Sequence, residues 1–210
     1  MPLQLLVYDN FLGDPMGVRN AALRLEYPRP AEKPNYPGRN SARPLMIQGV
    51  EEAVSKIVGE KLIAAPRTAH CYVRSALDGD DDNRLYNIHI DQMCWWAGIL
   101  YLTLPEHCRG GTEFYRHRET ASDHAPIYNH ELERLGAKTW GQAGEDIIER
   151  DSVDDSKWEH LMTVPMRFNR LILLRPWLWH TAGRSFGTAI ENGRLIQGFF
   201  FVPPAATTVW

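Results

Sequence analysis

Between residues 68 and 202 the chain alternates apolar and polar residues in short runs, a period of two that is typical of half-buried β-strands. Gly, Pro, Asn and Asp separate the runs and are typical turn residues. The expected strands lie within residues 68–77, 84–91, 95–104, 110–117, 162–168, 169–176, 178–183 and 194–202. Because short turns join most of them, the pattern predicts a mainly antiparallel β domain.

The first 67 residues follow a helical period instead. Asp14-Pro15 is a typical helix start, apolar residues follow it at helical spacing, and a group of prolines then ends the helix. A second helical period runs from Gly49 to Leu62. Eight strands behind a helical layer formed by residues 1–67 predict a mainly β fold with flanking helices, a double-sheet jelly roll of the cupin-like kind.

A polar and charged segment, residues 116–160, interrupts the strand pattern. It leaves the predicted sheet after residues 110–117 and returns at residues 162–168, so core strands anchor both of its ends. Connections of this length are uncommon unless they are functional. We therefore expect one domain over residues 1–210 with a core at 68–202, in which the segment forms a partly helical lid over the functional site.

Composition and charge exclude several classes of protein. The 210 residues are 44% hydrophobic and carry a net charge of -3 without a long block of one sign, so no nucleic-acid partner is expected. No apolar stretch approaches the roughly 20 residues of a membrane helix. Three cysteines without CxxC spacing, and an N-terminus without signal-peptide features, favour a reduced, cytoplasmic protein. The oligomeric state stays open.

The clearest chemical signal is the tripeptide His89-Ile90-Asp91. In a strand, residues i and i+2 project from the same face, so the imidazole and the carboxylate converge. His180, in a later expected strand, offers a third ligand. Two histidines and one carboxylate suit non-haem Fe(II), because they leave three adjacent coordination positions open. The tripeptide alone is weak evidence, since about half a chance match is expected in a chain of this composition.

Arg194 and Tyr101 supply the context that the tripeptide lacks. Arg194 begins the run RLIQGFFFV, and Tyr101 lies in the run GILYLTL, so each expected strand offers one polar group to one face. A planar guanidinium binds a carboxylate through two parallel hydrogen bonds, and a neighbouring phenol can donate another. The pair could therefore hold the far carboxylate of a dicarboxylic acid.

The stretch from HIDQMCWWAGILYLTLPEHCRGGTEFYRH through LILLRPWLWHTAG to RLIQGFFF resembles the Fe(II)/2-oxoglutarate-dependent dioxygenase superfamily. It is nearest to the prolyl-hydroxylase-like branch and to an uncharacterised bacterial subfamily within the superfamily. The order of the pieces matches over residues 68–202. The resemblance implies a double-stranded β-helix core with three iron ligands, His89, Asp91 and His180. It also implies a site for the 2-oxoglutarate cosubstrate formed by Arg194, Tyr101 and Tyr72.

The resemblance further implies an oxygenase that uses Fe(II), 2-oxoglutarate and O2 to hydroxylate an unactivated C–H bond, with release of succinate and CO2. The compact chain favours a small-molecule substrate such as an amino acid or a derivative. Two alternatives stay open: a hydroxylase of a peptide or protein side chain, and a non-catalytic, metal-containing jelly-roll binding module. Four residues near the ligand strands are candidate substrate contacts, namely Arg116, Arg118, Trp95 and Trp179.

Overall fold

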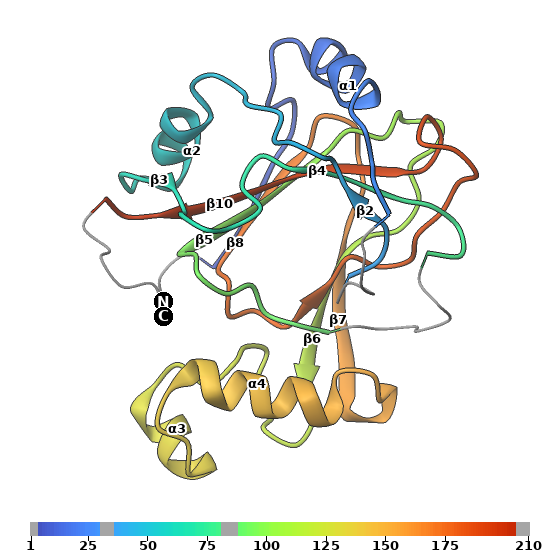
Figure 1. Cartoon of the computed structure of the whole chain (residues 1–210). Coiled ribbons are helices and arrows are strands. Elements are labelled where there is room, and N and C mark those ends of the chain that lie inside the picture. Colours follow the sequence, from blue (N-terminus) through green and yellow to red (C-terminus); the bar gives the residue numbers. More distant parts are fainter. Residues whose placement is uncertain (1–3, 30–35, 81–87, 205–210) are drawn as a thin grey trace.

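The computed structural model describes residues 4–29, 36–80 and 88–204. Within them, two antiparallel β-sheets lie between helices that cover their outer sides (Figure 1). This arrangement confirms the mainly antiparallel β architecture with flanking helices that the alternating pattern predicts. Residues 84–87 of the expected strand at 84–91, and part of the turn before it, lie outside the described residues.

The larger sheet has seven strands among the described residues. Its order is β1 (Leu5–Tyr8), β8 (Leu171–Leu174), β5 (Trp96–Tyr101), β10 (Arg194–Val202), β4 (Val73–Ala76) and β2 (Arg39–Asn40), with β3 (Ile63–Ala64) also paired to β10. The central strand β10 has the bounds that its sequence pattern predicts. Strand β4 begins later than expected, because the backbone turns at Cys71, whose φ of 64° is left-handed.

The smaller sheet has the order β7 (Trp158–Pro165), β6 (Gly111–His117) and β9 (His180–Thr181) in the described part of the chain. His89 joins it through an isolated bridge to His180. Strand β7 begins earlier than residues 162–168 predict, because it pairs with β6 along its whole length. Strand β9 is only two residues long, shorter than the expected 178–183.

Helices α1 (Pro15–Leu23) and α2 (Val50–Val58) cover the outer face of the larger sheet (Figure 1). Their buried side chains belong to one hydrophobic cluster with residues of β5 and β10, including Ala22, Val54, Leu100 and Phe199. The expected N-terminal helical layer is therefore present. The same segment is not helical throughout, however, since it adds the short strands β1, β2 and β3 to the sheet. Strands of two to four residues are too short for the sequence period to show.

The segment between β6 and β7 contains helices α3 (Asn129–Leu135) and α4 (Trp140–Asp151) and the 3₁₀ turn η1 (Asp155–Lys157), so it is partly helical as expected. It lies on the far side of the smaller sheet from α1 and α2 (Figure 1). Helix α4 packs closely there, because a Cβ added at Gly144 would lie 2.8 Å from Ile90 Cδ1. No described helix combines the length and the apolar character that crossing a membrane requires.

Candidate metal centre and its cavity

Backbone pairing places the two candidate histidine ligands side by side. His89 N donates to His180 O at 3.0 Å, and His180 N donates to His89 O at 3.1 Å. Residues that exchange both hydrogen bonds lie directly opposite each other and project their side chains from the same face. Asp91 follows on that face, and its amide donates to Pro176 O at 2.9 Å. Two strands far apart in the sequence thus assemble one cluster.

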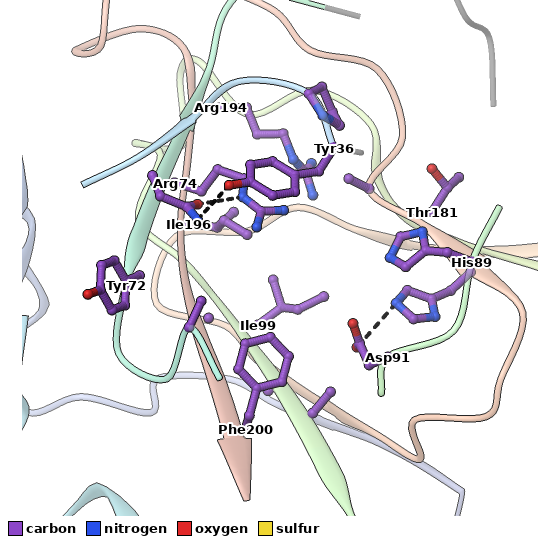
Figure 2. Close-up of a pocket in the computed structure, with 18 residues that line it drawn as sticks. Tyr36, Tyr72, Arg74, His89, Asp91, Ile99, Thr181, Arg194, Ile196 and Phe200 are labelled. Atoms are coloured by element: carbon purple, nitrogen blue, oxygen red, sulfur yellow. Dashed lines mark hydrogen bonds and ion pairs between the residues drawn. The ribbon is translucent and has the colours of Figure 1, made fainter. Parts of the chain in front are cut away.

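The three side chains converge as the tripeptide pattern predicts. One potential ligand atom from each of His89, Asp91 and His180 lies within 4.8 Å of the others (Figure 2). The two imidazole rings have centroids 4.5 Å apart, and His180 Nε2 is 3.5 Å from Asp91 Oδ2. Burial alone would raise the pKa of Asp91, but its hydrogen bond and charge interaction with His180 lower it below the ordinary value. The carboxylate is therefore ionised at neutral pH.

The ring of His180 has an orientation that suits metal binding. Its Nδ1 donates to Leu178 O at 2.8 Å, since a carbonyl can only accept. That bond leaves Nε2, which lies 3.5 Å from Asp91 Oδ2, as the ring atom that could bind a metal ion in place of a proton. Metal-binding histidines are commonly oriented in this way by a backbone carbonyl. Two imidazole nitrogens and one carboxylate at this spacing fit a divalent first-row metal with open coordination positions.

A second group with metal-ligand chemistry lies elsewhere and is already satisfied. His117, Glu119 and Asp151 also place one ligand atom each within 4.8 Å of the others. Here His117 Nε2 bonds to Asp151 Oδ2 at 2.9 Å, and Nδ1 bonds to Thr120 at 3.1 Å. Arg150 donates to both acidic residues. A guanidinium bonded to both carboxylates opposes a second cation, so this cluster is a structural ion-pair network.

The His89, Asp91 and His180 cluster lies in the wall of a cavity between the two sheets (Figure 2). The empty space in and around the cavity amounts to about 760 Å³, which includes open solvent. Its remaining lining comes mainly from the inward faces of β4, β5 and β10, with residues before β2 and after β9. The polar members of that lining are Tyr36, Asn40, Tyr72, Arg74, Thr181 and Arg194.

Arg194 reaches the cavity as the alternation of β10 predicts. Arg194, Ile196 and Gly198 line the cavity, while Leu195 and Phe199 pack toward the helices on the other face. The Arg194 side chain is inside the protein, because the residue is only 2% exposed. A guanidinium held within a cavity at this depth is a strong site for an anion, since the surrounding dielectric is low.

Tyr101 supports this end of the cavity from the neighbouring strand. It pairs with Ile196 across β5 and β10, and its ring centroid lies 5.7 Å from Arg194 Cζ. Its hydroxyl shares a 2.7 Å hydrogen bond with the hydroxyl of Thr112 on β6. Burial raises the pKa of Tyr101, so the phenol keeps its proton at neutral pH and can donate to an anion. Tyr72 lines the cavity directly, whereas Tyr101 lies behind its surface.

The four candidate substrate contacts lie outside this cavity. Arg116 forms an exposed ion pair with Glu159 at 3.2 Å, and Arg118 Nε donates to Trp158 O at 3.0 Å. Trp95 Nε1 donates to Glu60 Oε2, and Trp179 is fully buried against Trp158. No described residue of the segment 116–160 lines the cavity either. The structure places that segment behind the smaller sheet, so the expected closure over the site is not seen in it.

Sequence reasoning missed a second basic residue in the cavity, Arg74. It pairs with Ile196 across β4 and β10, so its side chain shares the inward face with Arg194. Arg74 Cζ lies 3.6 Å from the centre of the Tyr36 ring, and its Nε donates to Asn40 Oδ1 at 2.9 Å. The signal was available in the sequence, because residues i and i+2 of a strand share a face and Tyr72 was already a candidate.

The architecture resembles that of HygX from Streptomyces hygroscopicus. The structure of HygX with nickel, 2-oxoglutarate and hygromycin B bound aligns with a TM-score of 0.54 and 16% sequence identity, covering 97% of this chain and 84% of HygX. The structure with nickel and 2-oxoglutarate bound gives a TM-score of 0.55 and 17% identity, with the same coverage. At this identity the likeness concerns the fold.

Sequence comparison identifies a family without an assigned activity. None of the curated proteins matches this chain. The model of one family, described as a family of unknown function (DUF6445), matches residues 2–201, which is nearly the whole length of the sequence. The protein therefore belongs to the family of unknown function DUF6445.

Proposed function

We propose that the protein is an Fe(II)- and 2-oxoglutarate-dependent oxygenase that hydroxylates an unactivated C–H bond of a small molecule. The observation that carries this proposal is the cluster of His89, Asp91 and His180 in the wall of a cavity that also contains the buried guanidinium of Arg194. A metal face with open positions and a separate carboxylate receptor are the two parts that this chemistry needs.

The order of the strands supports a double-stranded β-helix. Strands β4, β5, β8 and β10 belong to the larger sheet, and His89, β6, β7 and β9 belong to the smaller sheet. In chain order the two groups alternate: His89 lies between β4 and β5, β6 and β7 lie between β5 and β8, and β9 lies between β8 and β10. Eight antiparallel segments that alternate between two facing sheets in this way make a jelly roll. The similarity in fold to HygX, whose structures contain 2-oxoglutarate, is consistent with this interpretation. Assignment to the prolyl-hydroxylase-like branch stays a prediction.

In this proposal His89, Asp91 and His180 hold Fe(II), and Arg194 binds the C5-carboxylate of 2-oxoglutarate, with Tyr101 and Tyr72 as further partners. The metal and the cosubstrate supply the oxidising chemistry with O2, and the cosubstrate is converted to succinate and CO2. The side chains of the protein position the metal and the cosubstrate and supply the charges that attract them. The carbonyl of Leu178 orients the His180 ring by accepting a hydrogen bond from Nδ1, and the burial of Arg194 strengthens its attraction for a carboxylate.

The cavity favours a small-molecule substrate. It lies between the two sheets, and its lining combines apolar residues with a few polar groups, which is the pattern found at small-molecule sites. The strands β5 and β10, which supply much of its lining, each pair with neighbours on both sides, so neither offers a free edge to an extended peptide. HygX has been solved with the small molecule hygromycin B.

Anaerobic titration of the purified protein with Fe(II) and then with 2-oxoglutarate tests the proposal. Chelation of Fe(II) by 2-oxoglutarate is expected to give a weak visible charge-transfer band that saturates at one equivalent of each. The variant His180→Ala should lose the band because it lacks one of three metal ligands. The variant Arg194→Gln should keep the band but need about 10- to 100-fold more 2-oxoglutarate, since a charge-assisted contact is removed.

Two controls make this experiment decisive. His160→Ala replaces an exposed histidine that contacts Thr163 on β7, away from the cavity, and should behave like the wild type. Release of succinate on admission of O2 then separates an enzyme from a non-catalytic metal-binding module. A wild-type protein that shows neither the band nor 2-oxoglutarate-dependent succinate would overturn the proposed function.

A further inference from the structure

We propose that Arg74, anchored by Tyr36 and Asn40, forms a second anion site in the cavity and binds a carboxylate of the organic substrate. This inference rests on the proposed function and specifies its substrate class as small carboxylic acids. The two guanidinium groups would then bind different ligands: Arg194 binds the cosubstrate, and Arg74 binds the substrate.

Both arginines face the same space. Arg194 pairs with Ala76, and Arg74 pairs with Ile196, so the two residues occupy diagonal positions on one face of the β4–β10 pair. Figure 2 shows the Arg74 guanidinium beneath the ring of Tyr36, with the Arg194 side chain directed toward the same region of the cavity. His89 and Asp91 lie across the cavity from them.

The surroundings of Arg74 hold its head group in place without neutralising it. The ring of Tyr36 covers one face of the guanidinium, Asn40 accepts a hydrogen bond from Nε, and Asn40 Nδ2 in turn donates to the Tyr36 hydroxyl at 2.9 Å. No carboxylate among the described residues forms an ion pair with Arg74. A guanidinium that is oriented through Nε and one face keeps its terminal N–H groups for a planar anion.

Burial lowers the pKa of Arg74 to about 10, so the group remains positively charged at neutral pH. The nearby charge of Arg194 also lowers the pKa, whereas Asp91 raises it. Two like charges are therefore kept close together in a cavity with a low dielectric, which is costly unless anions bind there.

The charges of the loaded site indicate how many anions it can take. Arg74, Arg194 and a divalent metal bring four positive charges, and Asp91 brings one negative charge. A 2-oxoglutarate dianion removes two of the three positive charges that remain. One positive charge is left, and a substrate carboxylate would neutralise it.

The two arginines differ in depth, and the difference decides their roles. Arg194 is 2% exposed and lies beside Tyr101, whose hydroxyl bonds to Thr112 of the smaller sheet. Arg74 is half-buried on β4, next to β2 at the end of the sheet order. The cosubstrate has to bind deeply to leave room for a substrate, so the more exposed arginine is the one that a substrate entering later would meet.

The test uses protein loaded with Co(II) and 2-oxoglutarate, in which no turnover occurs. Acetate is the probe, acetamide is its neutral analogue, and paramagnetic relaxation of their methyl protons reports binding near the metal. Saturable relaxation of acetate but not of acetamide is expected in the wild type. Arg74→Gln should weaken acetate binding about 10- to 100-fold, the effect of losing a charge-assisted pair of hydrogen bonds. Arg74→Lys should restore part of it, because lysine keeps the charge without the planar fork.

Three controls separate the possible causes of weaker acetate binding in the Arg74→Gln variant. Arg39→Gln removes the same charge from β2 but at a position that pairs with Ser75, on the opposite face of the sheet, and should not change acetate binding. Calorimetry with Zn(II)-loaded protein measures 2-oxoglutarate affinity, which Arg194→Gln should lower and Arg74→Gln should not. Asn40→Ala removes the hydrogen bonds to Arg74 Nε and to the Tyr36 hydroxyl but keeps the guanidinium, so it should weaken acetate binding less than Arg74→Gln does. The test therefore stands even if the glutamine variant does not fold.

The outcomes are distinct. Acetate that does not saturate, or that binds equally to the wild type and to Arg74→Gln, would show that Arg74 is no anion site. A loss of 2-oxoglutarate affinity in Arg74→Gln as large as that in Arg194→Gln would assign both arginines to the cosubstrate and refute the division of roles. Failure of the metal-loaded wild type to bind 2-oxoglutarate would refute the proposed function itself.

Discussion

Replacing Asp151 with asparagine tests how the segment between β6 and β7 is held against the smaller sheet. Asp151 ends helix α4, and its Oδ2 accepts hydrogen bonds from His117 Nε2 at 2.9 Å and from Arg150 NH2 at 2.7 Å. The side chains of His117 and Asp151 are 0% and 2% exposed. The pair therefore joins the helix to β6 inside the protein, where water cannot replace the lost contacts.

The expected loss of stability follows from these contacts. A hydrogen bond to a charged group contributes about 1.5–3 kcal/mol, and removal of one partner of a buried charged pair costs about 3–5 kcal/mol. Asparagine keeps one oxygen that can accept from His117, and the Arg150 side chain is 53% exposed, so solvent screens its share. We expect Asp151→Asn to lower the free energy of unfolding by about 2–3 kcal/mol at neutral pH.

The pH dependence gives this prediction a second, independent readout. The hydrogen bond from Arg150 holds the pKa of Asp151 below its ordinary value against the effect of burial, and His117 adds to the shift. A carboxylate with a lowered pKa in the folded state stabilises the fold fully above the unfolded pKa of about 3.9. That contribution is lost as the pH falls through the folded pKa. The wild type and the variant should therefore become similar in stability in acid.

Urea unfolding followed by tryptophan fluorescence, at about pH 7 and again below about pH 3, measures both effects. Asp146→Asn is the matched control, because Asp146 is exposed on the same helix, and its effect should stay within about 0.5 kcal/mol. Equal stability of Asp151→Asn and wild type at neutral pH would refute the idea that this buried pair anchors the segment. So would a difference between them that persists unchanged in acid.

Three further substitutions test the packing around the cavity. Gly111→Ala should destabilise the protein by about 1–3 kcal/mol in urea unfolding, because the added Cβ would lie 2.0 Å from the backbone oxygen of Val164 on β7. Phe199→Ala should cost about 3–5 kcal/mol in the same measurement, since the ring is fully buried on the helix-covered face, yet calorimetry should find 2-oxoglutarate binding retained. Tyr101→Phe should cost about 0.5–1.5 kcal/mol of stability by loss of the bond to Thr112, and should weaken 2-oxoglutarate binding less than Arg194→Gln does.

The sequence period was most informative where a strand is long and buried on both faces. Strand β10 has the predicted bounds, and its alternation correctly placed Arg194 on the face opposite Leu195. The i, i+2 spacing also brought His89 and Asp91 together. These features depend on local geometry alone, which a short stretch of sequence determines.

The candidate residues that lie away from the cavity occupy positions that depend on tertiary pairing. Trp179 was a candidate contact because it precedes His180, yet adjacent residues of a strand face opposite sides, and the structure places it away from the cavity. Arg116 lies near the end of β6 and Arg118 follows that strand, but β7 pairs with this end of β6, and both arginines lie outside the cavity. The face of Arg74 could have been predicted from its i, i+2 relation to Tyr72, but its contact with Tyr36, which comes from an irregular segment, could not.

The backbone pairing of His89 with His180 has a consequence for the time course of folding. The chain between them has to close a long loop before the two residues can pair, and this closure carries an entropic cost. Contacts between residues so distant in sequence form slowly. During refolding, the ability to bind a metal ion is therefore expected to appear in the slowest kinetic phase, after the helices of the N-terminal segment have formed.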